Sequence, residues 1–197
     1  MKRGTVALVV IALLAVGLFV TFKGNYNKMV TLDESVNSAW AQVENQYQRR
    51  SDLIPNLVST VRGYADFEQE TMVSVIEARN QATAVKVDPS DLSPEAIANF
   101  QQAQDGLSSA LSRLLVTVER YPDLKASQQF IQLQVQLEGT ENRISVERRK
   151  FNNEVQNFNS LIRRFPQNII GGIMGFSKKG YFESTAGAEN APKVNFD

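Results

Sequence analysis

The feature that most constrains the fold of this chain is a run of 18 residues without a charged side chain, from Thr5 to Phe22. A helix of that length is about 27 Å long, at about 1.5 Å per residue. This nearly matches the hydrocarbon core of a bilayer, which is roughly 30 Å thick. We therefore expect residues 5–22 to form a transmembrane helix that acts as a signal anchor, preceded by a short flank at residues 1–4.

Two other interpretations of the apolar run stay open. A cleaved signal peptide needs small residues after its apolar region, but Ala15-Val16-Gly17 lies inside the run. A buried core helix would be apolar on every face, which is unusual in a chain of 197 residues. Lys2 and Arg3 precede the run, so the distribution of positive charge favours a cytoplasmic N-terminus with the remainder of the chain outside.

The composition excludes most common catalytic and metal-binding arrangements. The chain has no cysteine and no histidine, which rules out thiol nucleophiles, disulfides, histidine triads and histidine or cysteine zinc sites. It carries 21 basic and 21 acidic residues, so it lacks the basic excess of most nucleic-acid-binding proteins. We expect no cofactor, no metal, no catalytic residue and no nucleic-acid partner.

The remainder of the chain has the periodicity of long helices. Apolar residues recur at steps that alternate between three and four in residues 36–64, 97–121 and 126–165. This spacing places one apolar stripe along each helix and is typical of bundles and coiled coils. The predicted fold class is all-α: the transmembrane helix, followed over residues 31–165 by an elongated antiparallel bundle of four or five helices.

Several short motifs predict where these helices begin and end. Thr31 to Glu34 fits a capping box, which predicts a first soluble helix starting at Leu32 and a neck over residues 23–30. Pro55 predicts a kink or brief break near Ser51, and a break makes the bundle five helices rather than four. Ser93-Pro94-Glu95 predicts a helix start, and the last helix is expected to cover residues 125–164.

The C-terminal part has a different character. Residues 166–183 are apolar and rich in glycine, and we expect a loop there without a helical period. Such a loop packs on its own bundle, on a second subunit or partner protein, or on the membrane surface beside Lys178 and Lys179. Residues 184–197 are small and polar and are predicted to be a disordered tail. The candidate partner-contact residues are Ile169, Ile170, Ile173, Phe176, Tyr181 and Phe182.

Polar side chains on the first and last bundle helices are the remaining candidates for a site. Arg50 and Arg148 fall on apolar stripes, and a buried arginine needs a carboxylate partner. The candidate buried polar network is Glu44, Arg50, Asp52, Glu141 and Arg148, with Arg50 and Glu141 as one specific pair. We interpret these residues as structural rather than catalytic, because nothing in the sequence predicts a cleft around them.

The sequence closely resembles the bacterial LemA family. The resemblance lies in AWAQVENQYQRR at residues 39–50 and DLIPNLV at residues 52–58, and extends to TENRI at residues 140–144 and YFE at residues 181–183. The resemblance implies one N-terminal membrane span and an antiparallel helical bundle. The family has no established catalytic residues, so the resemblance assigns none to this chain. Family members often have His-Glu where this chain has Phe67-Glu68. Some descriptions of the family place the short N-terminus outside the cell, so both orientations stay open.

Together these observations predict a single-pass protein of the bacterial cell (inner) membrane, with the bundle on the extracytoplasmic side. The predicted function is a non-enzymatic helical scaffold of the cell envelope that binds itself, as a homo-oligomer, or other envelope proteins, and contacts the lipid bilayer through residues 5–22. The alternative is a membrane-linked ligand sensor or carrier. A carboxylate-based hydrolase using Glu44 or Glu141 with Asp52 is a weaker alternative.

Overall fold

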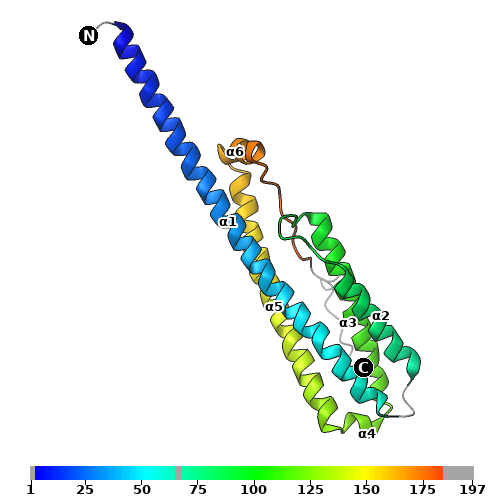
Figure 1. Cartoon of the computed structure of the whole chain (residues 1–197). Coiled ribbons are helices and arrows are strands. Elements are labelled where there is room, and N and C mark those ends of the chain that lie inside the picture. Colours follow the sequence, from blue (N-terminus) through cyan, green and yellow to red (C-terminus); the bar gives the residue numbers. More distant parts are fainter. Residues whose placement is uncertain (1–2, 65–67, 184–197) are drawn as a thin grey trace, which may run out of the picture.

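The computed structural model describes residues 3–64 and 68–183. Six helices and no strand lie in these residues, which confirms the all-α prediction (Figure 1). The helices are α1 (Arg3–Arg62), α2 (Gln69–Ala84), α3 (Pro94–Val118), α4 (Pro122–Lys125), α5 (Gln128–Ile162) and α6 (Gln167–Met174). The predicted disordered tail, residues 184–197, lies outside the described residues.

The bundle is elongated and its four long helices alternate in direction. α5 runs back along the C-terminal part of α1, and α2 and α3 form a second antiparallel pair beside them (Figure 1). α4 joins α3 to α5 at the end of the bundle farthest from the N-terminus, and α6 lies at the opposite end. The protein is therefore a rod, from which the N-terminal part of α1 projects alone.

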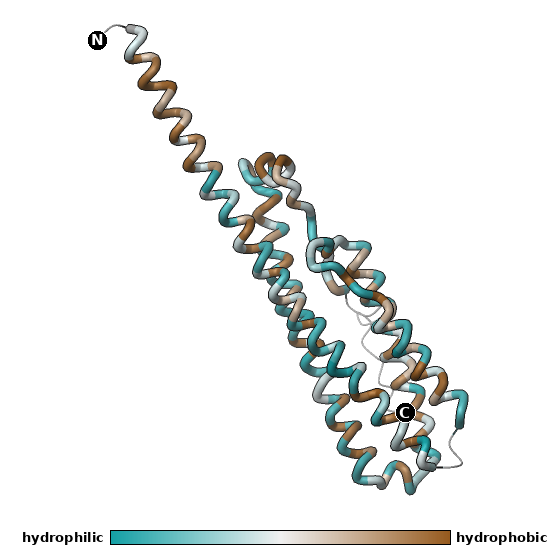
Figure 2. The backbone as a smooth tube through the Cα atoms, viewed as in Figure 1, coloured by the Kyte–Doolittle hydropathy of each residue, from teal (hydrophilic) through white to brown (hydrophobic). Residues whose placement is uncertain are grey.

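The projecting part of α1 has the composition of a membrane span. Among the described residues, α1 is the one helix long and apolar enough to cross a bilayer, and the other helices bury none of its most apolar 18-residue window. Figure 2 shows this apolar stretch continuing into a more polar helix where the bundle begins. The geometry fits a single-pass membrane protein, and the side of the membrane on which the bundle lies stays a prediction.

The predicted helix start at Leu32 is wrong, because α1 is helical from Arg3 through residues 23–30 to Arg62. Thr31 does not cap a helix: its hydroxyl donates to the Asn27 carbonyl oxygen one turn earlier, at 3.0 Å. The reason lies in tertiary packing. Met29, in the middle of the expected neck, is fully buried against Leu161 and Ile170, and this contact stabilises helical backbone that the local sequence leaves undecided.

Pro55 lies inside α1 without a break, so of the two predicted alternatives the four-helix bundle is the one observed. Proline has no N–H to donate to the carbonyl four residues earlier, which is that of Ser51. Arg79 of α2 supplies the missing donor, because its Nε lies 3.0 Å from the Ser51 carbonyl oxygen. A side chain from the neighbouring helix thus compensates for the proline.

The last predicted helix, residues 125–164, is interrupted at Ala126 and Ser127, and only residues 128–162 form α5. Leu124 of α4 is completely buried in the core cluster that also holds Phe130, and this contact fixes the turn between the two helices.

The predicted C-terminal loop also contains a helix, α6. It ends at Gly175, whose φ of 79° is a left-handed conformation that favours glycine. The predicted start at Ser93 is confirmed: Ala96 N–H donates to the Ser93 hydroxyl.

The core has two main clusters, one in each half of the rod. The cluster nearer to α6 surrounds Trp40, whose ring centroid lies 5.1 Å from that of Phe100 and 5.6 Å from that of Phe151. The other cluster fills the bundle between α1, α2 and α3 toward α4.

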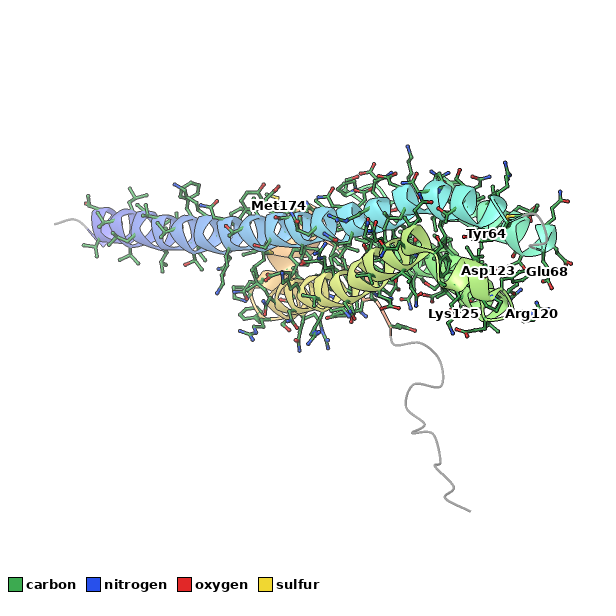
Figure 3. The ribbon with its side chains drawn as sticks, turned by 90° about the horizontal axis from the view of Figure 1, so that it is seen from below. Tyr64, Glu68, Arg120, Asp123, Lys125 and Met174 are labelled. Atoms are coloured by element: carbon green, nitrogen blue, oxygen red, sulfur yellow. The ribbon has the colours of Figure 1, made fainter. Side chains whose placement is uncertain are left out.

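Exposed ion pairs lie at the α4 end of the bundle: Arg120 pairs with Glu68 at 2.7 Å, and Lys125 pairs with Glu119. Figure 3 shows Tyr64, Glu68, Arg120, Asp123 and Lys125 gathered there, with Met174 at the other end.

The Arg79 contact generates a first prediction. Arg79→Met should lower the free energy of unfolding by about 1–3 kcal/mol, because it leaves the buried Ser51 carbonyl without a donor. In a Pro55→Ala background the cost should shrink, since residue 55 then supplies its own N–H. Chemical denaturation of the full chain in detergent, followed by circular dichroism, measures both values. Arg113→Met, at an exposed position on α3, is the control. An equal cost of Arg79→Met in both backgrounds contradicts this account.

Candidate functional site

The guanidinium of Arg50 is the polar centre of the bundle. Arg50 lies on the predicted apolar stripe of α1 and is only 1% exposed. Its Nη1 donates to the Ser108 hydroxyl at 2.9 Å and pairs with the Glu141 carboxylate at 3.0 Å. Its Nη2 donates to the Gln104 side-chain oxygen at 2.7 Å and also to the Gln104 carbonyl. The fork of one arginine therefore joins α1 to α3 and α5.

Gln104 extends this network to the remaining long helix. Its side-chain amide nitrogen donates to the Ala82 carbonyl oxygen of α2 at 3.1 Å. Gln104 is itself buried, and its amide oxygen and amide nitrogen are both hydrogen-bonded, to Arg50 and to α2 respectively. We name Arg50, Gln104, Ser108 and Glu141 the arginine cluster. Burying a charge is costly unless it is paired, and the cluster pairs Arg50 only when all four long helices are in register.

Tyr47 lies one turn before Arg50 on α1, and the Arg50 guanidinium carbon lies 5.0 Å from the centre of its ring. Burial raises the pKa of the Tyr47 phenol above its usual value of 10.0, and the nearby charges of Arg148 and Arg50 oppose this rise. The phenol therefore stays neutral at physiological pH, and its ring covers one side of the guanidinium.

The structure brings together only part of the predicted polar network. Arg50 and Glu141 are paired, but Glu44 and Asp52 are exposed, and Asp52 accepts a hydrogen bond from Gln48 at 2.8 Å. Arg148 lies elsewhere, with its guanidinium over the Phe182 ring at 4.5 Å and donating to the Glu183 carbonyl oxygen. The prediction missed Ser108 and the role of Gln104, although Gln104 occupies an apolar-stripe position, which is the signal that reveals a buried amide.

The seam between α3 and α5 is the open side of the bundle. α5 packs mainly on α1 and α3 mainly on α2, so the two helices have few close backbone contacts with each other. A cavity of about 250 Å³ lies in this seam beside the arginine cluster. It is lined by Arg50, Leu57, Ser108, Leu111, Ser112, Leu115, Gln134, Leu137, Glu138 and Glu141. We call this half of the seam, which runs from the arginine cluster toward α4, the distal groove.

The C-terminal segment fills the other half of the seam. We call residues 177–183, which follow α6 without regular secondary structure, the strap. Three amide side chains each hold one of its residues by both backbone groups: Asn159 holds Lys179, Asn152 holds Phe182 and Gln101 holds Glu183. The first two amides come from α5 and the third from α3. The strap therefore replaces direct packing between these helices.

Two further contacts fix the strap. Lys179 is buried and pairs with Asp33 of α1 at 3.0 Å. Gly180 passes so close to the start of α3 that a Cβ there would lie 2.7 Å from the Cα of Pro94, which excludes larger residues. Of the six predicted partner-contact residues, Ile170 and Phe182 are buried in the chain's own core and Phe176 is partly buried. Ile169, Ile173 and Tyr181 are exposed.

The described residues contain no group of three or more aspartate and glutamate side chains placed to hold a metal ion. The two terminal nitrogens of Arg50 are both engaged, and the three predicted carboxylates, Glu44, Asp52 and Glu141, do not converge on one point. The arrangement can position helices and leave an apolar groove open.

The arginine cluster generates a second prediction. Arg50→Met should destabilise the bundle by about 1–3 kcal/mol, because it leaves the buried Gln104 side-chain oxygen without its donor. Glu141→Gln should also destabilise the bundle, because the buried Arg50 guanidinium then lacks its carboxylate partner, although solvent at the half-exposed Glu141 position screens part of the loss. A double-mutant cycle from denaturation curves should give a coupling energy of about 1 kcal/mol. Glu44→Gln is the control, because Glu44 is exposed. A coupling energy of zero between Arg50 and Glu141 contradicts the observed pair.

The raised pKa of Tyr47 generates a third prediction. A phenol whose pKa is higher in the folded protein stabilises the fold below its unfolded pKa, and this contribution is lost as pH rises through the folded pKa. Stability of the wild type should therefore fall more steeply above pH ~10 than that of Tyr47→Phe. Denaturant titrations at pH values from 8 to about 11 compare the two slopes. Parallel pH profiles contradict burial of the phenol.

A model of the LemA family matches residues 39–196. Magnetosome protein MamQ 2 of Paramagnetospirillum magneticum is 28% identical over 200 residues, covering 92% of this chain and 74% of that protein. Magnetosome protein MamQ of Magnetospirillum gryphiswaldense is 28% identical over 207 residues, covering 95% and 76%. Protein LemA of Metamycoplasma hominis is 24% identical over 174 residues, covering 88% and 76%. The family model covers most of the four-helix bundle and the strap, and the chain belongs to the LemA family.

Proposed function

We propose that this protein is a membrane-anchored helical scaffold of the bacterial cell envelope, which binds other envelope proteins or further copies of itself and catalyses no reaction. In this proposal residues 5–22 are a signal anchor, and the bundle stands on the extracytoplasmic side. α1 supports the scaffold role, because one helix of 60 residues joins the apolar segment to the far end of the rod. A binding surface on the bundle is then held at a fixed height above the lipid.

The observation that carries the proposal is the distal groove. Most of the exposed surface of its lining is apolar. Next in sequence to the lining residues Leu115 and Gln134 are two exposed aliphatic residues, Val116 of α3, 72% exposed, and Val135 of α5, 62% exposed. Aliphatic side chains exposed together on facing helices mark an interaction surface. A groove between two helices accepts the apolar face of a third helix, as in other helix-in-groove complexes.

The charges that line the distal groove indicate which kind of helix face it can bind. On the α5 wall of the groove, Gln134 and Leu137 are uncharged, and the two carboxylates, Glu138 and Glu141, lie at the end nearest to Arg50. At the inner end of the groove, Arg50 and Glu141 already neutralise each other. A partner helix with a charged contact face would bury that charge without a counter-ion, which is strongly unfavourable. We therefore propose an uncharged, aliphatic helix face as the occupant.

The alternatives receive less support. A ligand sensor or carrier requires a pocket, and cavities that bind small molecules usually measure about 300–1,000 Å³ and enclose most of the ligand. The distal groove, with a volume of about 250 Å³, is smaller than this range and is partly open to solvent. A carboxylate hydrolase requires paired acids, and Glu44, Asp52 and Glu141 do not converge.

A fourth prediction tests the groove. Val116→Glu combined with Val135→Glu should abolish the complex formed by the wild type, because each variant places an unpaired charge in an apolar contact. Val73→Glu, at an exposed aliphatic position on α2, should leave the complex intact. The measurement is in-cell cross-linking followed by detergent extraction and determination of complex mass and composition. Circular dichroism checks that helicity is unchanged.

The composition of the wild-type complex identifies the partner. A stoichiometric second protein lost in the groove variant makes this chain an adaptor for that protein. A complex of this chain alone, lost in the same variant, makes it a self-assembling scaffold. A complex that persists in the groove variant, or a wild type that is monomeric after cross-linking, contradicts the proposal.

A further inference from the structure

The short helix α6 lies level with the end of the apolar segment of α1. Gln167, its first residue, donates to the Asn25 side-chain oxygen at 2.7 Å. Tyr26 and Phe176 have ring centroids 6.0 Å apart, and Phe22, the last residue of the uncharged run, packs against the same small cluster. In Figure 2 α6 is coloured mostly as apolar and lies at the level where the apolar part of α1 ends.

α6 has one face for the bundle and one face that nothing in the described residues covers. The inner face consists of Ile170, which is buried, and Gly171, where a Cβ would lie 3.5 Å from the Met29 sulfur. On the outer face, Ile169 is 53% exposed and Ile173, one helical turn later, is 74% exposed. Phe165, in the turn that precedes α6, is 79% exposed, and we call these three exposed apolar side chains the stripe.

The charges at this end of the bundle have a single sign. No aspartate or glutamate occurs in residues 1–32 or 155–182. Lys23, Lys28, Arg163, Arg164 and Lys178 are all exposed there. Lys179 is the exception among the cations, because it is buried and paired with Asp33. The end of the rod nearest to the apolar segment is thus hydrophobic and basic.

We propose that α6 is an interfacial membrane helix, which lies on the leaflet from which α1 emerges and binds anionic phospholipids. The stripe of Phe165, Ile169 and Ile173 enters the boundary between headgroups and acyl chains, and the basic side chains contact phosphate groups. Apolar residues on one face flanked by lysine and arginine are characteristic of such helices. This inference rests on the proposed membrane anchoring by α1.

Position and charge favour lipid over a second protein chain as the occupant. The stripe lies where the apolar segment of α1 ends, so a bilayer spanned by residues 5–22 places its headgroups beside α6. A second copy meeting this surface symmetrically would bring two sets of cations together, which is unfavourable. Two contacts with one membrane would fix the tilt and rotation of the rod, and so the direction in which the distal groove faces.

The absence of cysteine from the sequence makes the test direct. An environment-sensitive fluorophore is attached to the full chain at a single cysteine, introduced as Ile173→Cys. The labelled protein is reconstituted into nanodiscs of phosphatidylcholine with about one quarter phosphatidylglycerol, with bromine atoms at known acyl-chain depths as quenchers. Val116→Cys is the matched control, because Val116 is equally exposed but lies on α3, away from α6. Leu13→Cys, inside the apolar segment, reports on the anchor.

We expect bromolipid to quench the labels at residues 13 and 173 but not the label at residue 116. Quenching at residue 13 with a water-exposed label at residue 173 overturns the interfacial helix and leaves the anchor intact. A label at residue 173 that is shielded from water but not quenched by bromolipid also overturns the interfacial helix, because a second chain then covers the stripe. No quenching at residue 13 overturns the proposed anchoring and the inference built on it.

The lipid composition tests the role of charge. Quenching at residue 173 should be at least about twofold stronger with phosphatidylglycerol than with phosphatidylcholine alone, since anionic lipid attracts the basic side chains. Arg163→Gln combined with Arg164→Gln should reduce that ratio toward one. Lys86→Gln, an exposed lysine between α2 and α3, should leave it unchanged. Equal quenching in both lipids with the native basic residues overturns the proposed selectivity for anionic lipid.

Discussion

One unbroken helix is the constraint on which the rest of the structure depends. α1 runs from Arg3 to Arg62, so the apolar segment and the first helix of the bundle share one set of backbone hydrogen bonds. A flexible neck would let the bundle turn freely above the membrane. The continuous helix couples the orientation of the apolar segment to that of the rod, and the packing of α5 and α6 around Met29 stabilises the stretch where a neck was expected.

The second constraint is that α3 and α5 each pack mainly on another helix and have few close backbone contacts with each other. The strap fills one half of their seam through side-chain amides of both helices, and the arginine cluster joins them at the middle. The distal groove is what remains open. A buried ion pair is often no more stabilising than apolar residues of the same volume. It does, however, raise the free energy of every alternative helix alignment in which Arg50 is buried without its partners. The cluster therefore specifies how the four helices align, and that alignment shapes the groove.

The sequence predicted the elements whose signals are local and periodic, and failed where distant contacts decide. The apolar stripes predicted the long helices, and the stripe position of Arg50 predicted its burial. The helix through residues 23–30 was missed because Leu161 and Ile170 stabilise it from more than 100 residues away. Pro55 suggested a break because the donor that replaces its N–H belongs to Arg79. α6 has only eight residues, too few for a periodic signal, and the distal groove depends on how far apart two helices settle.

The central claim is that membrane span and rod are one rigid helix, and a distance measurement tests it most directly. Spin labels at Val20→Cys and Asn45→Cys, both at exposed positions, bracket the expected neck in a chain without native cysteine. In nanodiscs, pulsed electron paramagnetic resonance should give a narrow distribution centred near 38 Å, which is 25 residues at about 1.5 Å each. A broad distribution extending to clearly shorter distances would show a hinge between membrane and bundle, and would contradict the account.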